Sequence, residues 1–302
     1  MRALVISGGG SKGAFAGGVA QYLMEEHGHE YDIFIGTSTG SLLISHLALG
    51  KIEKIKEVYT SVNQNSIFSR CPFTINKKHG VATIGINHWN VLKNFYDGSR
   101  TFGESHNLLK LIRQTLSPQE FIILKEQHKD IVVTVSNLSL NQVEYKSIRD
   151  FDYDNFCEWI WISCNYTPFM SLVRKDGCEY ADGGLGSMVP IEEAIKRGAT
   201  EVDAIILHTE VTHYNRLPSK NVFSLLTSMF SFMLDRIERQ NIRIGKFVAN
   251  QNESIINFYY TPTVLTTNSL IFDKQKMTSW WSSGFNFAQS KSENLSQIEP
   301  NE

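Results

Sequence analysis

IFIGTSTGS, residues 33–41, is a short apolar run that ends in Gly-x-Ser-x-Gly and continues into an apolar helical pattern. This order predicts a strand, a sharp turn and a helix, with Ser38 at the bend. A serine in such an elbow presents its hydroxyl above the edge of the sheet, and Gly36 and Gly40 leave room for strand and helix to cross. The stretch therefore predicts a nucleophilic serine at Ser38.

A second glycine-rich turn lies earlier in the chain, between another predicted strand and helix. Residues 2–7 form an apolar run, residues 8–13 read GGGSKG, and apolar residues then recur at helical spacing over residues 14–26. A loop of this kind aims several backbone N–H groups at one point, which creates a site for negative charge. The predicted anion site comprises Gly8, Gly9, Gly10, Ser11, Lys12 and Gly13.

The glycine-rich loop at residues 8–13 has two possible uses. As Gly-x-Gly-x-x-Gly it could bind a dinucleotide, but that use needs an acidic residue at the end of the next strand. Asp32 lies at the beginning of that strand, and the loop is not followed by the Gly-Lys-Ser/Thr of a P-loop. Because a predicted nucleophile follows on the next strand, we favour an oxyanion hole.

Composition narrows the class of protein. The chain has 302 residues and a net charge of −2, which gives no indication of nucleic acid as a partner. Its four cysteines lack metal-site spacing, so reduced thiols and a cytoplasmic location are expected. The first apolar run is too short for a signal peptide, and we expect no transmembrane segment. Peripheral contact with membranes remains compatible with these features.

Strand and helix patterns alternate over the first two hundred residues. This alternation predicts an α/β fold: a three-layer α/β/α sandwich around a mainly parallel central sheet. Residues 65–105 interrupt the alternation with glycines, a proline and several aromatic residues. We interpret them as an irregular segment that covers the active site.

The serine needs a base, which the fold must bring from elsewhere in the chain. Asp182 is the best-placed carboxylate, since it ends a predicted strand, and Gly183 and Gly184 allow a close approach around it. An aspartate before Gly-Gly is also a common turn former. A rival histidine base would be His208, at the end of the strand over residues 202–207, whereas His46 is expected in the core.

Three ordered motifs resemble the signatures of the patatin-like phospholipases: GGGSKG at 8–13 with Gly17 or Gly18 downstream, GTSTG at 36–40, and DGG at 182–184. The resemblance covers residues 2 to about 207. It implies a Ser38–Asp182 dyad that acts without histidine on acyl esters of glycerolipids, with neither metal nor organic cofactor. It also implies that the glycine loop supplies the oxyanion hole, with Gly9 and Gly10 as the foremost donors.

The last third carries weaker signals. Residues 219–250 predict an amphipathic helix, for which we favour packing on the sheet over binding to a bilayer. Residues 258–262 predict an edge strand, and residues 273–290 a helix whose aromatic side chains close the core. We expect one domain over residues 1–290, with a motif-bearing core at 2–207, a less regular part at 210–290, and a polar, disordered tail at 291–302.

The expected function is that of a lipid acyl hydrolase of the phospholipase A or lysophospholipase type, with phospholipid or lysophospholipid as substrate. An acyltransferase that uses the same acyl-serine is the alternative within enzymes. A catalytically silent lipid-binding or regulatory module is the alternative from another class, although it would have no chemical reason to retain the serine, the aspartate and the glycine loop together. A dinucleotide-binding enzyme is the least favoured interpretation.

Overall fold

The structure, a computed structural model, describes residues 1–78, 81–211 and 222–298. Its centre is an eight-stranded sheet in the order β10-β9-β1-β2-β5-β8-β7, with β6 also paired to β5. The strands are β10 (Ile255–Tyr260), β9 (Glu201–Ile206), β1 (Arg2–Ile6), β2 (Ile33–Thr37), β5 (Asp130–Asn137), β8 (Cys178–Asp182), β7 (Val173–Lys175) and β6 (Gln142–Ser147). The pairs from β10 to β5 are parallel, whereas β6 and β8 run antiparallel to β5.

The central strands are buried on both faces, and their side chains alternate between two apolar cores. Leu4 and Ile6 of β1 point into one core, and Ala3 and Val5 point into the other. Because successive side chains of a strand point to opposite faces, an almost continuous apolar run serves both layers. The result confirms the predicted three-layer α/β/α sandwich.

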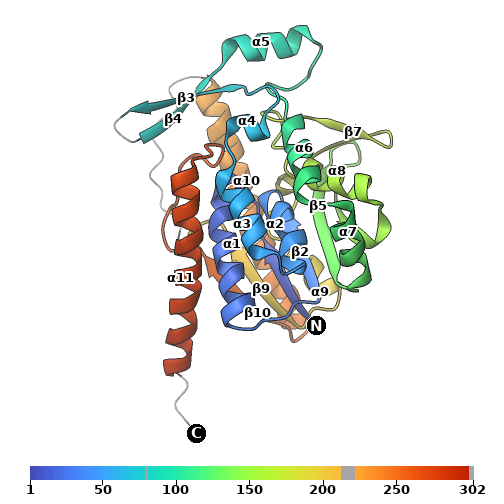
Figure 1. Ribbon diagram of the computed structural model, residues 1–302, viewed down its shortest axis with the longest axis vertical. Coiled ribbons are helices and arrows are strands. Elements are labelled where there is room, and N and C mark those ends of the chain that lie inside the picture. Colours follow the sequence, from blue (N-terminus) through green and yellow to red (C-terminus); the bar gives the residue numbers. More distant parts are fainter. Residues whose placement is uncertain (79–80, 212–221, 299–302) are drawn as a thin grey trace.

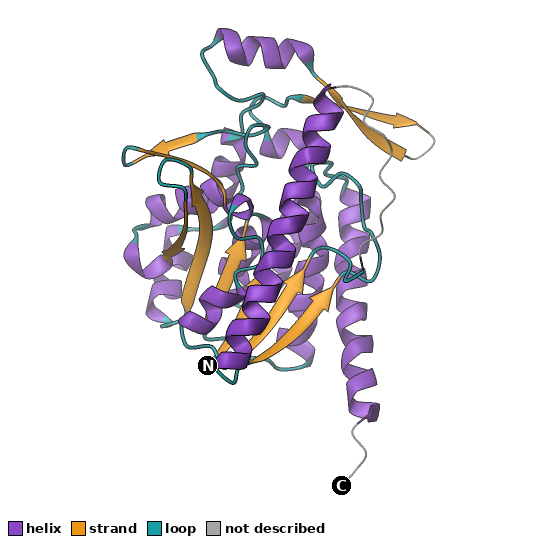
Figure 2. Ribbon diagram, turned by 180° about the vertical axis from the view of Figure 1, so that it is seen from behind, coloured by secondary structure: helices purple, strands orange, loops and turns teal. Residues whose placement is uncertain are grey.

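Helices cover both faces of the sheet (Figures 1 and 2). The larger core lies under α1 (Gly13–Gln21), α2 (Thr39–Ala48), α3 (Ile52–Ser61), α6 (His106–Thr115), α7 (Pro118–Glu126), α8 (Tyr153–Ser163) and α11 (Lys274–Ile298). The smaller core lies under α9 (Ile191–Lys196) and the long α10 (Val222–Gln251). Leu234, Ile237 and Val248 of α10 pack on this second core, as the favoured interpretation of residues 219–250 predicts for the part from Val222 onward.

The prediction of an irregular segment over residues 65–105 is wrong. This region contains α4 (Gln64–Ile67), an antiparallel pair of β3 (Phe73–Lys78) and β4 (Val81–Ile86), and α5 (His88–Tyr96). Asn63 and Asn87 cap the two helices through their side chains, so each short element has a defined start. Of the described residues from 68 to 105, none lines the cavity beside Ser38, so these described residues form no wall of the cavity.

The C-terminal helix extends further than predicted. α11 continues to Ile298, beyond Ser290, where the sequence analysis placed the start of a disordered tail. The Lys291 ammonium group donates a hydrogen bond to the carbonyl oxygen of Phe258 and lies 4.7 Å from the Tyr259 ring. These contacts attach the helix at Lys291 to the edge strand β10. The polar composition of residues 291–302 does not indicate such contacts.

α11 packs closely along α1 through glycines. A Cβ atom at Gly18 would lie 1.9 Å from the carbonyl oxygen of Trp281, and one at Gly17 would lie 2.2 Å from its ring. Trp281 is buried, and its indole N–H donates to the Gln21 side chain at 2.8 Å. The aromatic residues of α11 thus close the core, as predicted. None of the helices in the described ranges has the length and apolar character that crossing a membrane requires.

Candidate functional site

Ser38 lies at a sharp turn between β2 and α2. Its backbone has φ 51° and ψ −119°, a left-handed conformation that is strained for a residue with a side chain. A Cβ atom at Gly36 would lie 2.4 Å from the Gly40 carbonyl carbon, and one at Gly40 would lie 2.3 Å from the Ile6 carbonyl oxygen. The tight crossing therefore requires both glycines, as the elbow motif predicts.

The end of α8 supports this turn. The Ser163 hydroxyl accepts a hydrogen bond from the Ser38 N–H at 2.9 Å and lies 2.9 Å from the Ser41 hydroxyl. The Cys164 thiol donates to the Ser38 carbonyl oxygen at 3.0 Å. These contacts hold the strained peptide from both sides.

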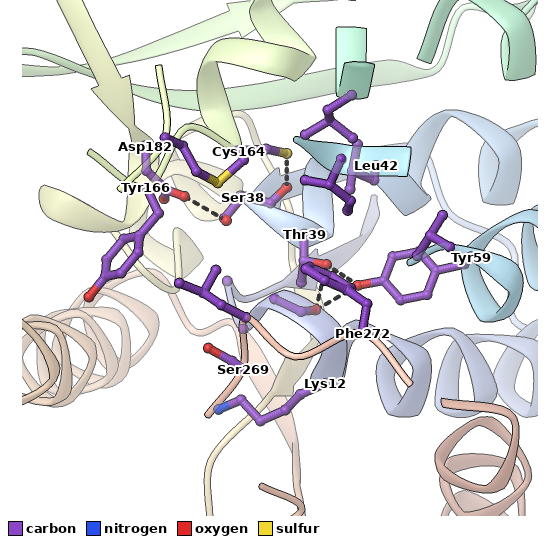
Figure 3. Close-up of a pocket in the computed structure, with 18 of the residues that line it drawn as sticks. Lys12, Ser38, Thr39, Leu42, Tyr59, Cys164, Tyr166, Asp182, Ser269 and Phe272 are labelled. Carbon is purple, nitrogen blue, oxygen red and sulfur yellow. Dashed lines mark hydrogen bonds between the residues drawn. The ribbon is translucent and has the colours of Figure 1, made fainter. Parts of the chain in front are cut away.

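Ser38 and Asp182 are hydrogen-bonded. The Ser38 hydroxyl donates to Oδ2 of Asp182 at 2.7 Å, and the Gly184 N–H donates to Oδ1 at 2.7 Å. The pair meets across β5: Thr37 of β2 is in register with Thr134, and Asp182 of β8 is in register with the next residue, Val135. Because β8 runs antiparallel and ends at this level, its last side chain reaches the elbow (Figure 3).

Burial makes Asp182 an unusually basic carboxylate. It is buried, and this loss of hydration raises its pKa to about 7, although the hydrogen bonds from Ser38 and Gly184 act in the opposite direction. A carboxylate with this pKa is ionised in about half of the molecules at neutral pH. It also holds a proton more strongly than an exposed aspartate does, which suits a general base.

Gly8, Gly9 and Gly10 line the cavity in front of Ser38. A Cβ atom at Gly8 would lie 3.2 Å from the Ser38 Cβ, so the loop approaches the serine directly. Among the described residues, no hydrogen-bond acceptor takes the backbone N–H of Gly9 or Gly10. The Gly10 carbonyl oxygen accepts hydrogen bonds from the Tyr59 hydroxyl at 2.6 Å and from the Thr39 hydroxyl at 3.0 Å, which fixes the orientation of its peptide.

The other half of the glycine loop has different surroundings. The Ser11 N–H donates to the Ser269 carbonyl oxygen at 2.8 Å, and Gly13 begins α1 next to the Tyr59 hydroxyl. Lys12 turns its ammonium group away toward the Leu207 carbonyl oxygen, at 2.6 Å, and burial lowers its pKa to about 8. The structure thus places Gly8 next to Ser38 and Gly9 and Gly10 in the wall of the same cavity, whereas the N–H of Ser11 is already engaged.

A cavity of about 240 Å³ opens beside Ser38 and is lined mainly by apolar side chains. It follows one face of α2, where Leu42, Ser45 and His46 succeed Ser38 at helical spacing. Ser38 and His46 are eight residues apart, so the cavity extends about 12 Å along the helix. Further apolar walls come from α3, α6 and α8, among them Ile55, Val58, Val62, Leu108, Leu111, Ile112 and Ile160.

Two walls of the cavity were missed in the sequence. Thr227, Ser231 and Leu234 of α10 contribute one, and residues 267–270 together with Phe272 contribute the other, beside the glycine loop (Figure 3). These segments follow the motif-bearing core by many residues and carry no motif. The role of Tyr59 was missed for the same reason, since it is one aromatic residue in an ordinary amphipathic helix.

The histidines do not contact the pair. His208 lines the cavity, but its Nδ1 lies 2.7 Å from the Glu238 carboxylate and its Nε2 lies 3.2 Å from the Lys12 ammonium group. His46 is buried in the core, as expected, with Nε2 at 3.2 Å from the Thr115 carbonyl oxygen. Within the described part of the chain, no histidine is hydrogen-bonded to Ser38 or Asp182.

Comparisons with known proteins found a family model and a solved structure that are similar to this chain. A family model described as patatin-like phospholipase matches residues 4–195, and a search of curated proteins found no match. The crystal structure of VipD from Legionella pneumophila is similar to this chain, with a TM-score of 0.53 and 15% sequence identity. The similarity covers 96% of this chain and 66% of that one, and at this identity it shows a shared fold.

Proposed function

Because this chain belongs to the patatin-like phospholipase family, we propose that it is a lipid acyl hydrolase of the phospholipase A or lysophospholipase type, with Ser38 as nucleophile and Asp182 as general base. The observation that carries the proposal is the 2.7 Å hydrogen bond from the Ser38 hydroxyl to the buried carboxylate. The strained elbow and the apolar cavity beside it support the same reading.

In the proposed reaction, Asp182 takes the proton from the Ser38 hydroxyl while Oγ attacks the acyl carbonyl carbon. The proton then passes to the oxygen of the leaving alcohol, and an acyl-serine remains. Asp182 next takes a proton from water, the resulting hydroxide attacks the acyl-serine, and the fatty acid leaves as Ser38 regains its proton. The Gly184 N–H keeps the carboxylate oriented throughout.

The oxyanion of each tetrahedral intermediate needs donors beside Ser38. We assign this role to the backbone N–H groups of Gly9 and Gly10, since acceptors within the described residues leave both free. Tyr59 and Thr39 act as positioning residues, because they hold the carbonyl oxygen of Gly10 in the next peptide along the loop, directly after the Gly10 N–H. Losing one such donor in a comparable site costs on the order of 100-fold to 1000-fold in rate.

The acyl chain fits the cavity along α2. Many of its wall residues are leucine, isoleucine and valine, whose side chains a hydrocarbon chain can contact without loss of hydrogen bonds. The cavity begins at Ser38, so a carbonyl carbon placed at the serine leaves the chain directed along the helix. This arrangement supports a fatty acyl ester as the substrate class.

Labelling with a fluorophosphonate tests the nucleophile. We expect one covalent adduct, mapped to Ser38 by peptide mass spectrometry, and release of fatty acid from phospholipid or lysophospholipid by the unlabelled protein. Ser38→Ala should abolish both, and Asp182→Asn should slow both by at least about 100-fold. Full turnover by either folded variant would contradict the dyad. Product analysis with an added alcohol separates hydrolysis from acyl transfer.

A further inference from the structure

α5 has an inverted distribution of polarity. Its inner face is polar: the Asn90 side chain donates to the Cys71 carbonyl oxygen at 2.8 Å, and the fully buried Asn94 accepts from the Arg70 guanidinium group at 2.7 Å. The Asn94 amide also donates to the Thr101 carbonyl oxygen at 3.3 Å. Hydrogen bonds rather than apolar packing therefore attach this face of the helix to the body.

The outer face of α5 is apolar and exposed to solvent. Trp89, Leu92 and Tyr96 are 84%, 61% and 92% exposed, and their spacing of three and four residues places them on one side of the helix. Phe95 is also largely exposed, although its ring lies 6.0 Å from that of Phe102. A surface helix normally has the opposite arrangement. A contiguous apolar face of this kind is typical of a docking surface.

The charge of the same segment favours an anionic partner. Between Cys71 and Tyr96 the chain contains three lysines and neither aspartate nor glutamate, whereas the whole chain has a net charge of −2. Tryptophan and tyrosine flanked by lysine are the side chains that lie at the interface between acyl chains and head groups of a bilayer. Lysine side chains near an anionic bilayer strengthen binding through attraction to the lipid phosphates.

The position of α5 matches that of the cavity. The arrowheads of the parallel strands point to the end of the molecule at which α5 stands away from the body, and Ser38 follows the end of β2 (Figures 1 and 2). The N-terminal end of α10 lies at this end too. Its exposed side chains are also apolar: Leu225, Met229, Phe232 and Met233.

Aromatic rings connect α5 with the wall of the cavity. Phe102 lies next to Phe95 and 5.8 Å from Phe169, whose ring is 5.4 Å from that of Tyr166, measured between centroids. Tyr166 lines the cavity beside Asp182 (Figure 3). These contacts link α5 to the wall of the cavity.

We propose that the outer face of α5, with the exposed apolar side chains at the start of α10, binds the surface of an anionic phospholipid bilayer. The proposal rests on the proposed function only in that the bilayer supplies the ester. Aromatic and leucine side chains enter the region between head groups and acyl chains, and the exposed Lys93 of α5 contacts the phosphates. The cavity entrance then faces the membrane from which the substrate comes.

Flotation with vesicles tests this surface. Wild-type protein should bind vesicles of phosphatidylcholine mixed with phosphatidylglycerol more strongly than vesicles of phosphatidylcholine alone, and added salt should weaken the difference. W89S/Y96S should lower the partition coefficient by about tenfold or more, because two aromatic side chains no longer leave water. Equal binding of W89S/Y96S and wild type would overturn the proposal.

Phe247→Ser is the matched control. Phe247 and Phe232 are both 62% exposed on α10, but they are fifteen residues, or about 22 Å, apart along the helix. Phe247→Ser should therefore bind vesicles as the wild type does. Lipids brominated in the acyl chain should quench the fluorescence of Trp89, and the quenching should be smaller in Trp89→Phe than in the wild type. Identical quenching in both proteins would contradict insertion of α5.

Hydrolysis of p-nitrophenyl butyrate separates this inference from the proposed function. The wild type, W89S/Y96S and Phe247→Ser should hydrolyse this water-soluble ester equally, whereas W89S/Y96S should lose activity on vesicles. Vesicle binding through α5 without hydrolysis of any ester would refute the enzyme and leave the docking surface intact. Ester hydrolysis without vesicle binding would refute the docking surface and leave a protein as the partner of α5.

Discussion

The proton that Asp182 exchanges with Ser38 links the chemistry of the site to its burial. A carboxylate at the surface would hold its proton too weakly to act as an efficient base near neutral pH. Enclosure raises the pKa to about 7, and the hydrogen bonds from Ser38 and Gly184 keep the ionised form accessible. The same enclosure has consequences for activity and for stability that separate experiments can measure.

The activity should depend on pH through this carboxylate. The base is active when ionised, so kcat/KM for a soluble ester should reach its plateau above about pH 7 and fall tenfold per pH unit well below it. Initial rates from about pH 5 to about pH 9 measure this acidic limb of the pH–rate profile. A limb near pH 4, the range of an exposed aspartate, would exclude Asp182 as the base with the surroundings described above.

Asp182→Asn should stabilise the protein at alkaline pH. The unfolded chain loses this proton near pH 4 and the folded chain near pH 7, so stability falls as pH rises between these values and stays lower above them. Asparagine does not ionise, and it can still accept from Gly184 and donate to Ser38. We expect a gain of about 1–2 kcal/mol at pH 8.

Urea unfolding at two pH values measures this effect, because the variant and the wild type should have equal free energies of unfolding at about pH 4, where both side chains are neutral. A variant less stable than the wild type at both values would show that ionised Asp182 is not a source of strain.

The C-terminal end of helix α8 supports the elbow at Ser38 through a hydrogen bond. Ser163 is fully buried and satisfies the Ser38 N–H, which a strained turn at the start of α2 would otherwise leave without an acceptor. Strand β8 then carries Asp182 to the other side of Ser38. The site therefore depends on the relative position of α8, β2 and β8 more than on any single motif.

Ser163→Ala should lower kcat by about 10-fold to 100-fold with little change in KM, because the elbow loses its orientation while the apolar cavity remains. The unsatisfied N–H should also cost about 1–3 kcal/mol in the free energy of unfolding. Ser147→Ala is the control. Ser147 is a buried serine bonded to the Asp130 carboxylate at 2.6 Å, and its loss should affect stability alone. Equal losses of kcat in both variants would remove the specific role of Ser163.

The close packing of α1 against α11 can be tested by adding one methyl group at Gly18. Gly18→Ala would place Cβ 1.9 Å from a backbone oxygen of Trp281, so the helices must separate. We expect a loss of about 2 kcal/mol or more in thermal or urea unfolding. Thr278→Ala, at an exposed position of the same α11, should change the free energy of unfolding little. An unchanged midpoint for Gly18→Ala would contradict the close packing of α1 and α11.

The cavity is completed by parts of the chain that are distant in sequence. The glycine loop comes from the beginning, the apolar walls from α2 to α8, and the remaining walls from α10 and residues 267–272. The family match ends at residue 195, yet the larger core includes Trp281 and Ala288 of α11. The larger of the two cores therefore joins the N-terminal elements to the C-terminal helix.

A fragment of residues 1–207 should consequently fail to fold. It lacks α11, which covers α1, and both β10 and α10, which cover the edge and one face of the sheet. We expect an insoluble or noncooperative fragment, whereas the full chain should unfold in one transition by circular dichroism. A fragment with a native-like cooperative transition would place a domain boundary near residue 207.

Local sequence determined the parts of the fold that depend on neighbouring residues. An apolar run followed by glycines predicts β1, β2 and the elbow at Ser38, because burial on two faces and tight turns are decided within a few residues. The aromatic residues of α11 likewise indicated a helix that closes the core. The short elements between residues 65 and 105 were not recognised, because glycines and polar residues dilute their periodicity.

Tertiary structure alone decided how these parts meet. Ser38 and Asp182 are 144 residues apart, and their hydrogen bond depends on the register of β2 and β8 against β5. The pKa of about 7 at Asp182 follows from the walls that enclose it, and the apolar outer face of α5 emerges only once Asn90 and Asn94 are seen to point inward. Such properties depend on contacts between distant segments, which no local pattern specifies.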